Sequence, residues 1–147
     1  SGLEWGKVLH FGTHNAGRLA LHICKTMLTT MLSDNQAGFV KIKDLGIKLT
    51  EEIQSISKKN NKNKMICQGV NSMFQIFFTD QEKICNYRDF CRSVDRIKFR
   101  NFALKLFDKG IYMNPSATLH SLSSIIHTEK DIEVTARAIA ETLDEMP

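Results

Sequence analysis

The sequence Met73-Phe74-Gln75-Ile76-Phe77-Phe78 predicts a β-strand that is buried for most of its length. Aromatic and β-branched residues favour strands, and Gly69 and Asp80 are turn-forming residues on either side of this run. The helical spacing of apolar residues that precedes it disappears at Met65. We therefore expect Met65-Ile66-Cys67 to form a second, shorter strand ahead of the main one.

Two helices are predicted before these strands, over residues 15–32 and 37–57. In each, apolar residues recur every three or four positions, which places them on one helix face. They are Leu19, Ala20, Ile23, Met27, Leu28, Met31 and Leu32 in the first helix and Phe39, Ile42, Leu45, Leu49, Ile53 and Ile56 in the second. Ser33-Asp34-Asn35 predicts a break between the two helices. Gly46 either weakens the second helix by about 1 kcal/mol relative to alanine or lets another backbone approach closely.

Helices and short strands are predicted to alternate in the rest of the chain. A helix over 95–109 ends at Gly110, strands follow at 111–113 and 122–127, and Thr128 caps a final helix. This order indicates an α+β fold, in which helices cover one face of a small, mostly antiparallel sheet. Residues 1–14 are expected to form a leading segment and residues 15–147 a single domain.

The composition excludes several classes of protein. A chain of 147 residues suits one domain with a sizeable core, and a hydrophobic fraction of 42% argues against global disorder. No run of about 18 apolar residues predicts a transmembrane helix. The first residues lack the pattern of a signal peptide, so we expect a cytoplasmic location. The cysteines lie inside apolar segments without zinc-ligand spacing, and we expect buried thiols; they are Cys24, Cys67, Cys85 and Cys91.

The net charge of +4 includes one dense basic run, from Lys58 to Lys64. We interpret this run as a solvated loop, because no aromatic residue lies among the lysines for nucleic-acid bases to stack on. The alternative is a nucleic-acid-binding patch, which predicts binding that weakens steeply with salt.

No self-contained catalytic or metal site is predicted. The chain has no phosphate-binding loop, no dinucleotide-binding glycine motif, no H-E-x-x-H and no G-x-S-x-G. His10 and His14 are four residues apart, but Gly12 between them makes a helical pair of metal ligands doubtful. We therefore assign neither a catalytic residue nor a metal ligand to this chain.

Five motifs nevertheless stand in a characteristic order. They are Gly12-Thr13, then Val70-Asn71-Ser72-Met73-Phe74 with Ile76-Phe77-Phe78-Thr79, then Asn86-Tyr87-Arg88-Asp89 with Asp95, Lys98-Phe99 and Phe102, then Gly110-Ile111-Tyr112-Met113-Asn114-Pro115-Ser116, and finally His127-Thr128-Glu129-Lys130-Asp131-Ile132. Together they resemble the C-terminal region of class III pyridoxal-phosphate aminotransferases, most of all the glutamate-1-semialdehyde aminomutase group. The resemblance runs from residue 8 to 145 and implies the small-domain fold of these enzymes.

The resemblance also implies that this chain does not catalyse transamination alone. In the family, the lysine that forms the Schiff base with pyridoxal 5'-phosphate precedes the Gly-Thr motif, and no lysine here matches it. The threonine of that motif reaches the cofactor phosphate, typically in the partner subunit, which makes Gly12 and Thr13 candidate cofactor-binding residues. A hydroxyl and a backbone N–H at a helix start suit a phosphate. The alternative is that Gly12-Thr13 is only a turn that leads into a helix.

The sequence departs from the family in two places. Ala16-Gly17-Arg18 stands where the family usually has Gly-Asn-Pro after the Gly-Thr motif. Leu119 stands where the aminomutases have a glutamate that faces the active site, which argues against the glutamate-semialdehyde reaction. By resemblance, Ser116 and Leu119 line the substrate pocket.

Two hypotheses about function follow from the resemblance. The first is a C-terminal small domain that closes the active site of a pyridoxal-phosphate-dependent aminotransferase or aminomutase and supports its dimer. Its partners are a large cofactor-binding domain, on the same or a separate chain, and a second copy in a homo-oligomer, with neither membrane nor nucleic acid. The second is a non-catalytic interaction module derived from that domain, and both departures from the family favour it.

Overall fold

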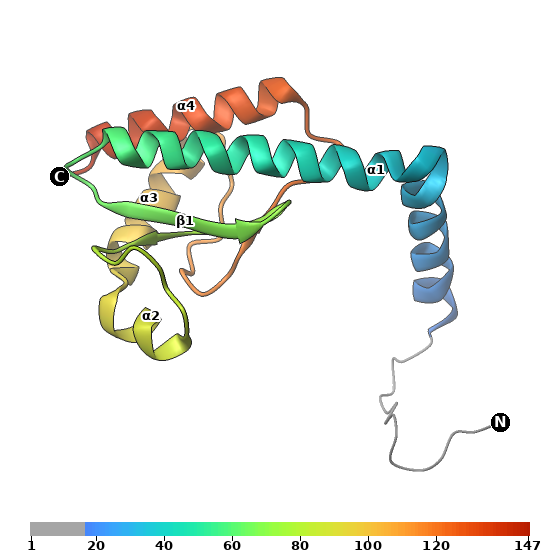
Figure 1. Ribbon diagram of the computed structural model, residues 1–147, viewed down its shortest axis with the longest axis horizontal. Coiled ribbons are helices and arrows are strands. Elements are labelled where there is room, and N and C mark those ends of the chain that lie inside the picture. The colour runs from blue at the N-terminus through green and yellow to red at the C-terminus, as the bar shows by residue number, and fades with distance from the viewer. Residues whose placement is uncertain (1–16) are drawn as a thin grey trace, which may run out of the picture. The chain divides into compact units, whose positions relative to one another are not determined.

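The computed structural model describes residues 17–147, so Gly12, Thr13 and the boundary expected near residue 14 lie outside the described residues. Contacts within the chain divide it into two units, Ser1–Gly38 and Phe39–Pro147. Helix α1 (Arg18–Lys59) begins in the first unit and ends in the second. Figure 1 shows the order of the elements along the chain.

In the first unit, the described residues form the beginning of α1. The backbone leaves the helical conformation at Ser33, and Asp34, Asn35 and Gln36 follow with φ values of 48°, 56° and 65°. Short polar side chains such as those of Asp and Asn tolerate this left-handed conformation better than most residues. The break predicted at Ser33-Asp34-Asn35 is therefore confirmed. Before the break, Met31 is buried, and the exposed apolar residues are Leu19, Leu21, Ile23, Met27, Leu28 and Leu32.

Three antiparallel strands form the sheet of the second unit, in the order β1 (Met65–Val70), β2 (Met73–Phe78) and β3 (Ser121–Leu122). The turn Asn71-Ser72 joins the first two strands, and Asn71 adopts a positive φ of 52° there. The strand predicted over residues 73–78 and the shorter strand before it are both confirmed.

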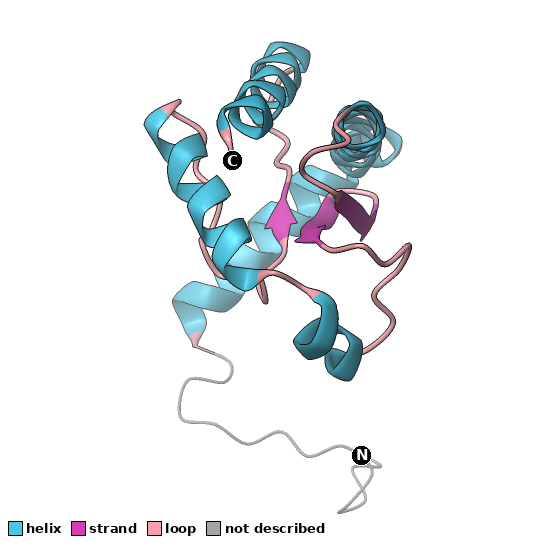
Figure 2. Ribbon diagram, turned by 90° about the vertical axis from the view of Figure 1, so that its left-hand side faces the viewer, coloured by secondary structure: helices cyan, strands magenta, loops and turns pink. Residues whose placement is uncertain are grey.

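The inner face of this sheet carries the core of the second unit. Because side chains alternate along a strand, Phe74, Ile76 and Phe78 of β2 share this face with Met65 and Cys67 of β1. The part of α1 after residue 38, α3 (Arg96–Asp108) and α4 (Glu129–Glu145) supply many of the other buried residues (Figures 1 and 2). The predicted α+β arrangement, with helices against one face of a small antiparallel sheet, is confirmed.

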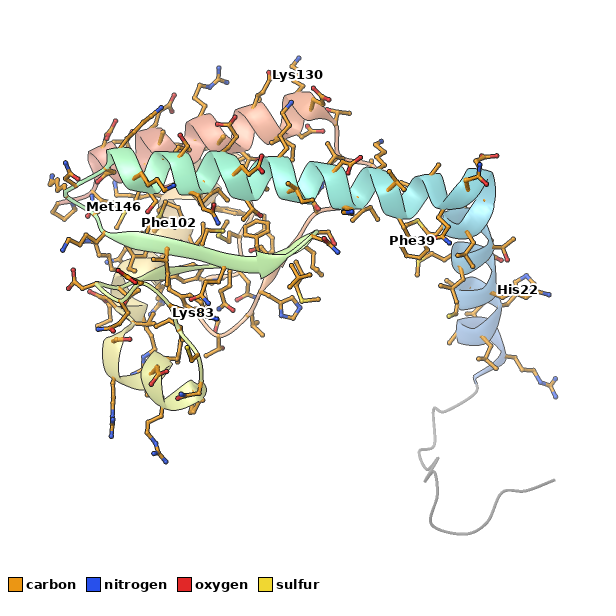
Figure 3. All side chains as sticks on the ribbon, viewed as in Figure 1. His22, Phe39, Lys83, Phe102, Lys130 and Met146 are labelled. Atoms are coloured by element: carbon orange, nitrogen blue, oxygen red, sulfur yellow. The ribbon has the colours of Figure 1, made fainter. Side chains whose placement is uncertain are left out.

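Aromatic rings connect α3 to this sheet. Phe102 is fully buried, and its ring meets the ring of Phe78 edge to face, with 5.3 Å between the centroids. In Figure 3, Phe102 lies in the interior of the second unit, whereas Lys130 lies at its edge. The helix predicted over residues 95–109 is thus present, and it packs against the sheet through Phe102.

The helix termini confirm two local predictions. Thr128 Oγ1 accepts a hydrogen bond from Asp131 N, and the Asp131 carboxylate accepts one from Thr128 N. The side-chain and backbone bonds from Thr128 hold the pKa of Asp131 below its usual range. At the end of α3, Gly110 has a φ of 81°, as predicted for a residue that closes a helix.

Gly46 lies in α1 against the turn between β1 and β2. An added Cβ at this position would lie 2.4 Å from the Asn71 carbonyl oxygen and 2.5 Å from Ser72 Cα. Of the two interpretations of Gly46, the structure therefore favours a close approach of another backbone.

One helix was not predicted, namely α2 (Tyr87–Ser93). Asn86 caps it by accepting a hydrogen bond from Asp89 N, at 3.0 Å. Its buried residue Phe90 contacts the ring of Phe77, with 6.0 Å between centroids, on the outer face of the sheet. With seven residues, this helix is too short to show a repeated apolar period.

Two strand predictions were wrong. Residues 111–113 form no strand, because Ile111 N donates its hydrogen bond to Leu106 O at the end of α3 and is not available to a sheet. The strand predicted over residues 122–127 is reduced to Ser121–Leu122. Beyond it, Ser124 and His127 bond to each other in a turn, from His127 N to Ser124 O and from Ser124 N to His127 Nδ1.

The prediction of four buried thiols was wrong for three of them, since Cys24, Cys85 and Cys91 are exposed. These three cysteines have apolar neighbours in the sequence, but their own side chains lie outside the core of their unit. Cys67 is buried, and this burial raises the pKa of its thiol to about 12. Across residues 17–147, no three Cys, His, Asp or Glu side chains gather as metal ligands. In the same residues, no helix has both the length and the apolar character needed to cross a bilayer.

Candidate functional site

A pair of glutamines on the outer face of the sheet holds two loops against it. Gln68 and Gln75 are cross-strand partners in β1 and β2. Gln68 Oε1 accepts from Ile84 N at 2.7 Å, and Gln68 Nε2 donates to Ile84 O at 3.2 Å. Gln75 Nε2 donates to Ala117 O. These bonds fix the loop before α2 and the loop that contains the two predicted substrate-pocket residues.

Ser116 and Leu119 lie together on one turn of that second loop. Leu119 N donates to Ser116 O at 3.0 Å, and Ser116 N donates to Asn114 Oδ1 at 2.9 Å. The hydroxyls of Ser116 and Thr118 form a hydrogen bond of 2.8 Å with each other. The Leu119 side chain is 48% exposed. The structure therefore brings the two residues together, on a loop that the sheet holds in place.

Beside this loop, the outer face of the sheet ends in three exposed apolar residues, which we call the open end of the sheet. The register pairs Met73 with Val70 on one side and with Leu122 on the other, so their side chains point to one face. They are exposed to 75% (Val70), 47% (Met73) and 59% (Leu122). The same face is covered by α2 at Phe77 and by the loop at Gln75, and it is open at this end.

The glutamines were not singled out from the sequence. Each is a polar residue at an outward position of an otherwise apolar strand, and this pattern is the signal that marks them. Thr118 was also missed, since its role is a contact to Ser116 that spacing alone does not reveal.

Replacing Gln75 with leucine should loosen this loop, because the Ala117 carbonyl then loses its donor. We expect a loss of stability of about 1 kcal/mol, or roughly fivefold faster amide hydrogen exchange at Leu119 if the loop opens alone. Hydrogen exchange followed by mass spectrometry or NMR measures this directly. Gln81→Leu, at an exposed position after β2, is the control that should leave exchange in the loop unchanged.

Two lysines of the second unit, Lys48 and Lys109, are not suited to form a Schiff base with a cofactor. Such a lysine must lose its proton to attack a carbonyl, which requires a lowered pKa. Lys48 and Lys109 instead have raised pKa values, because hydrogen bonds to Glu129 at 2.9 Å and to Glu145 at 2.8 Å favour the protonated ammonium. Lys48 and Lys109 are therefore poor candidates for such a lysine.

Comparison with known sequences gives a consistent group of relatives, although no family model matches the chain. The chain is 35% identical to a glutamate-1-semialdehyde 2,1-aminomutase from Alkaliphilus oremlandii over 141 residues, which are 96% of this chain and 31% of that protein. It is 34% identical to the aminomutase from Clostridium kluyveri over 108 residues, 74% of this chain and 25% of that protein. The chain thus spans about a third or less of the length of these relatives.

Solved structures show the same fold. A β-phenylalanine aminotransferase from Variovorax paradoxus superposes with a TM-score of 0.78, at 21% identity, over 95% of this chain and 31% of that one. A glutamate-1-semialdehyde aminomutase from Pseudomonas aeruginosa in complex with PMP gives the same TM-score, at 13% identity, over 97% of this chain and 31% of that one. The fold described above is therefore the fold of one segment of these enzymes.

Proposed function

We propose that this chain is the small domain of a larger enzyme. The chain belongs to the family of class III transaminases and glutamate-1-semialdehyde 2,1-aminomutases, and it corresponds to about a third of their length. In this proposal it joins a large domain that binds pyridoxal phosphate and carries the reactive lysine. The chain then closes one side of the active site and supports the dimer. It is not catalytic alone.

The observation that carries this proposal is the exposed apolar surface of α1 before its break. On a helical wheel, where successive residues are about 100° apart, the apolar positions from Leu19 to Leu32 cover an arc of about 220° around the helix axis. A helix at the surface of a soluble domain needs an apolar stripe of only about 100°. Leu19, Ile23 and Met27 are more than half exposed. Such a helix favours burial between two or more elements, and the part of the relatives outside the match to this chain can supply them.

Two pairs of residues have proposed roles in the assembled enzyme. Gly12 and Thr13 contact the cofactor phosphate, a role suited to a backbone N–H and a hydroxyl. Ser116 and Leu119 face the substrate from the loop that Gln75 holds. The sheet thus supplies a fixed support for one wall of the substrate pocket.

A chimera tests the proposal. The segment of the Alkaliphilus oremlandii relative that aligns with this chain is replaced by the chain itself, and the purified protein is examined for size and for cofactor absorbance. We expect a dimer that retains pyridoxal phosphate through gel filtration. A chimera that folds but neither dimerises nor retains the cofactor would contradict the proposal and favour the non-catalytic module.

Thr13→Ala in the same chimera tests the phosphate contact. Loss of one charge-assisted hydrogen bond should weaken cofactor retention by about tenfold, corresponding to roughly 1.5 kcal/mol. Thr29→Ala is the control, because Thr29 is an exposed helical residue with no assigned role. Equal retention in the two variants removes Thr13 from the cofactor site while leaving the small-domain assignment intact.

A further inference from the structure

The loop with Ser116 and Leu119 and the open end of the sheet lie in two segments that carry no formal charge. Residues 65–79 and 110–128 contain no Asp, Glu, Lys or Arg, although such residues make up 24% of the chain. The two segments meet in the pairing of β2 with β3 and in the bond from Gln75 to Ala117 O. The charged side chains of the second unit therefore belong to its other elements.

The apolar residues of this surface are close to one another through the backbone. Gln75 and Met73 are two residues apart on the outer face of β2, so the bond to Ala117 O holds the loop against the face that Met73 shares. The chain then passes Leu119 and returns to β3, where Leu122 pairs with Met73. Leu119 thus lies in the chain between Ala117, which Gln75 holds, and Leu122, which belongs to the open end of the sheet.

The polar groups near Leu119 are largely engaged with one another. The hydroxyls of Ser116 and Thr118 share a hydrogen bond, and the Asn114 side chain accepts from Ser116 N. His127 Nδ1 accepts from Ser124 N, which leaves the exposed His120 as the imidazole of this loop. A substrate carboxylate placed here finds no fixed cation from the two segments. Lys41 of α1 reaches this stretch at Ile125, where its ammonium donates to the backbone carbonyl oxygen at 2.6 Å. Within the two segments themselves, no charge compensates the desolvation of a carboxylate against leucine side chains.

From this surface we infer that the substrate group that meets Leu119 is uncharged and apolar, such as an alkyl or aryl side chain. This inference rests on the proposed function, because it concerns the substrate pocket of the assembled enzyme. Leu119 then determines specificity by packing against that group, and it disfavours a substrate that ends in a carboxylate at this point.

A matched pair of non-reacting acids tests the inference in the cofactor-bound chimera. Pentanoate and glutarate have the same number of carbons and differ only in a terminal methyl or carboxylate. Calorimetry gives the ratio of their affinities in the chimera and in the unmodified Alkaliphilus oremlandii relative. We expect the affinity for pentanoate divided by the affinity for glutarate to be at least about tenfold higher in the chimera than in the relative. Discrimination of this size is within the range that apolar pockets achieve.

Variants assign the effect to Leu119. Leu119→Arg should shift the ratio back towards glutarate by at least about tenfold, since a guanidinium pairs with a carboxylate. Leu104→Arg is the matched control, because Leu104 on α3 has the same exposure of 48%. His120→Gln should leave the ratio unchanged.

Each result decides one of the two claims. If the chimera retains its cofactor and Leu119→Arg shifts the ratio no more than Leu104→Arg does, the inference is wrong and the proposed function stands. If the chimera binds glutarate as well as the unmodified relative does, the inference is also wrong. If the chimera folds without dimerising or retaining the cofactor, the proposed function fails before any acid is titrated, and the inference fails with it.

Discussion

Gly46→Ala should destabilise the second unit, although alanine favours helices over glycine by about 1 kcal/mol. The new Cβ would lie 2.4 Å from the Asn71 carbonyl oxygen and 2.7 Å from its carbonyl carbon. These are backbone atoms of the turn that joins β1 to β2, so they cannot move aside without disturbing the hairpin. We expect a net loss of about 2–3 kcal/mol in the free energy of unfolding, the usual range for overpacking a tight site.

Gly38→Ala is the matched control on the same helix. There, the nearest atom to an added Cβ is Met31 Sδ at 2.9 Å, and the flexible methionine side chain can move away. The nearest backbone atom, Met31 Cα, is 3.2 Å away, compared with 2.4 Å at Gly46. Urea denaturation of both variants measures the difference. A Gly46→Ala protein as stable as the original, or more stable, would show that the helix and the hairpin do not approach each other so closely.

Gly46 also shows which features could be predicted from the sequence alone. The apolar period assigned the residue to a helix, and this assignment is correct. Whether glycine was a weakness of that helix or a requirement of its packing depended on the turn at Asn71, which comes later in the sequence. Local periodicity contains no information about which distant backbone lies against a helix face.

The wrong strand at residues 111–113 has a similar cause. Ile111 and Met113 are apolar and partly or fully buried, as residues of a strand would be. The N–H of Ile111, however, completes the C-terminus of α3 by donating to Leu106 O, and burial there does not require a sheet partner. Sequence pattern thus predicts burial better than it predicts the partner of each backbone group.

The candidate site was predictable only through the resemblance. Ser116 and Leu119 belong to a motif, and the structure places them on one turn. The Gln75 contact that holds this turn joins residues far apart in the sequence, so no local pattern indicates it. Gly12 and Thr13 lie outside the described residues, and their roles stay predictions.

Met27→Glu should have little effect on the isolated chain and a large effect on the chimera. Met27 is 58% exposed in the chain alone, where a surface substitution changes stability by about 0.5 kcal/mol or less. In the chimera, the proposed function buries this side chain against the large domain. An unpaired carboxylate buried there costs about 3–5 kcal/mol, which should lower the melting temperature and release the cofactor.

Thr29→Glu separates burial from the general effect of an added charge. Thr29 is two positions further along the same helix, on its polar side, and is also exposed. Differential scanning fluorimetry of the two variants, each in the chain alone and in the chimera, gives four melting temperatures. If Met27→Glu lowers the melting temperature of the chimera no more than Thr29→Glu does, the apolar arc of α1 is not the surface that meets the large domain. A selective effect of Met27→Glu in the chimera supports the small-domain assignment, because an interaction module that acts without a large domain gives no reason for this face to be buried there.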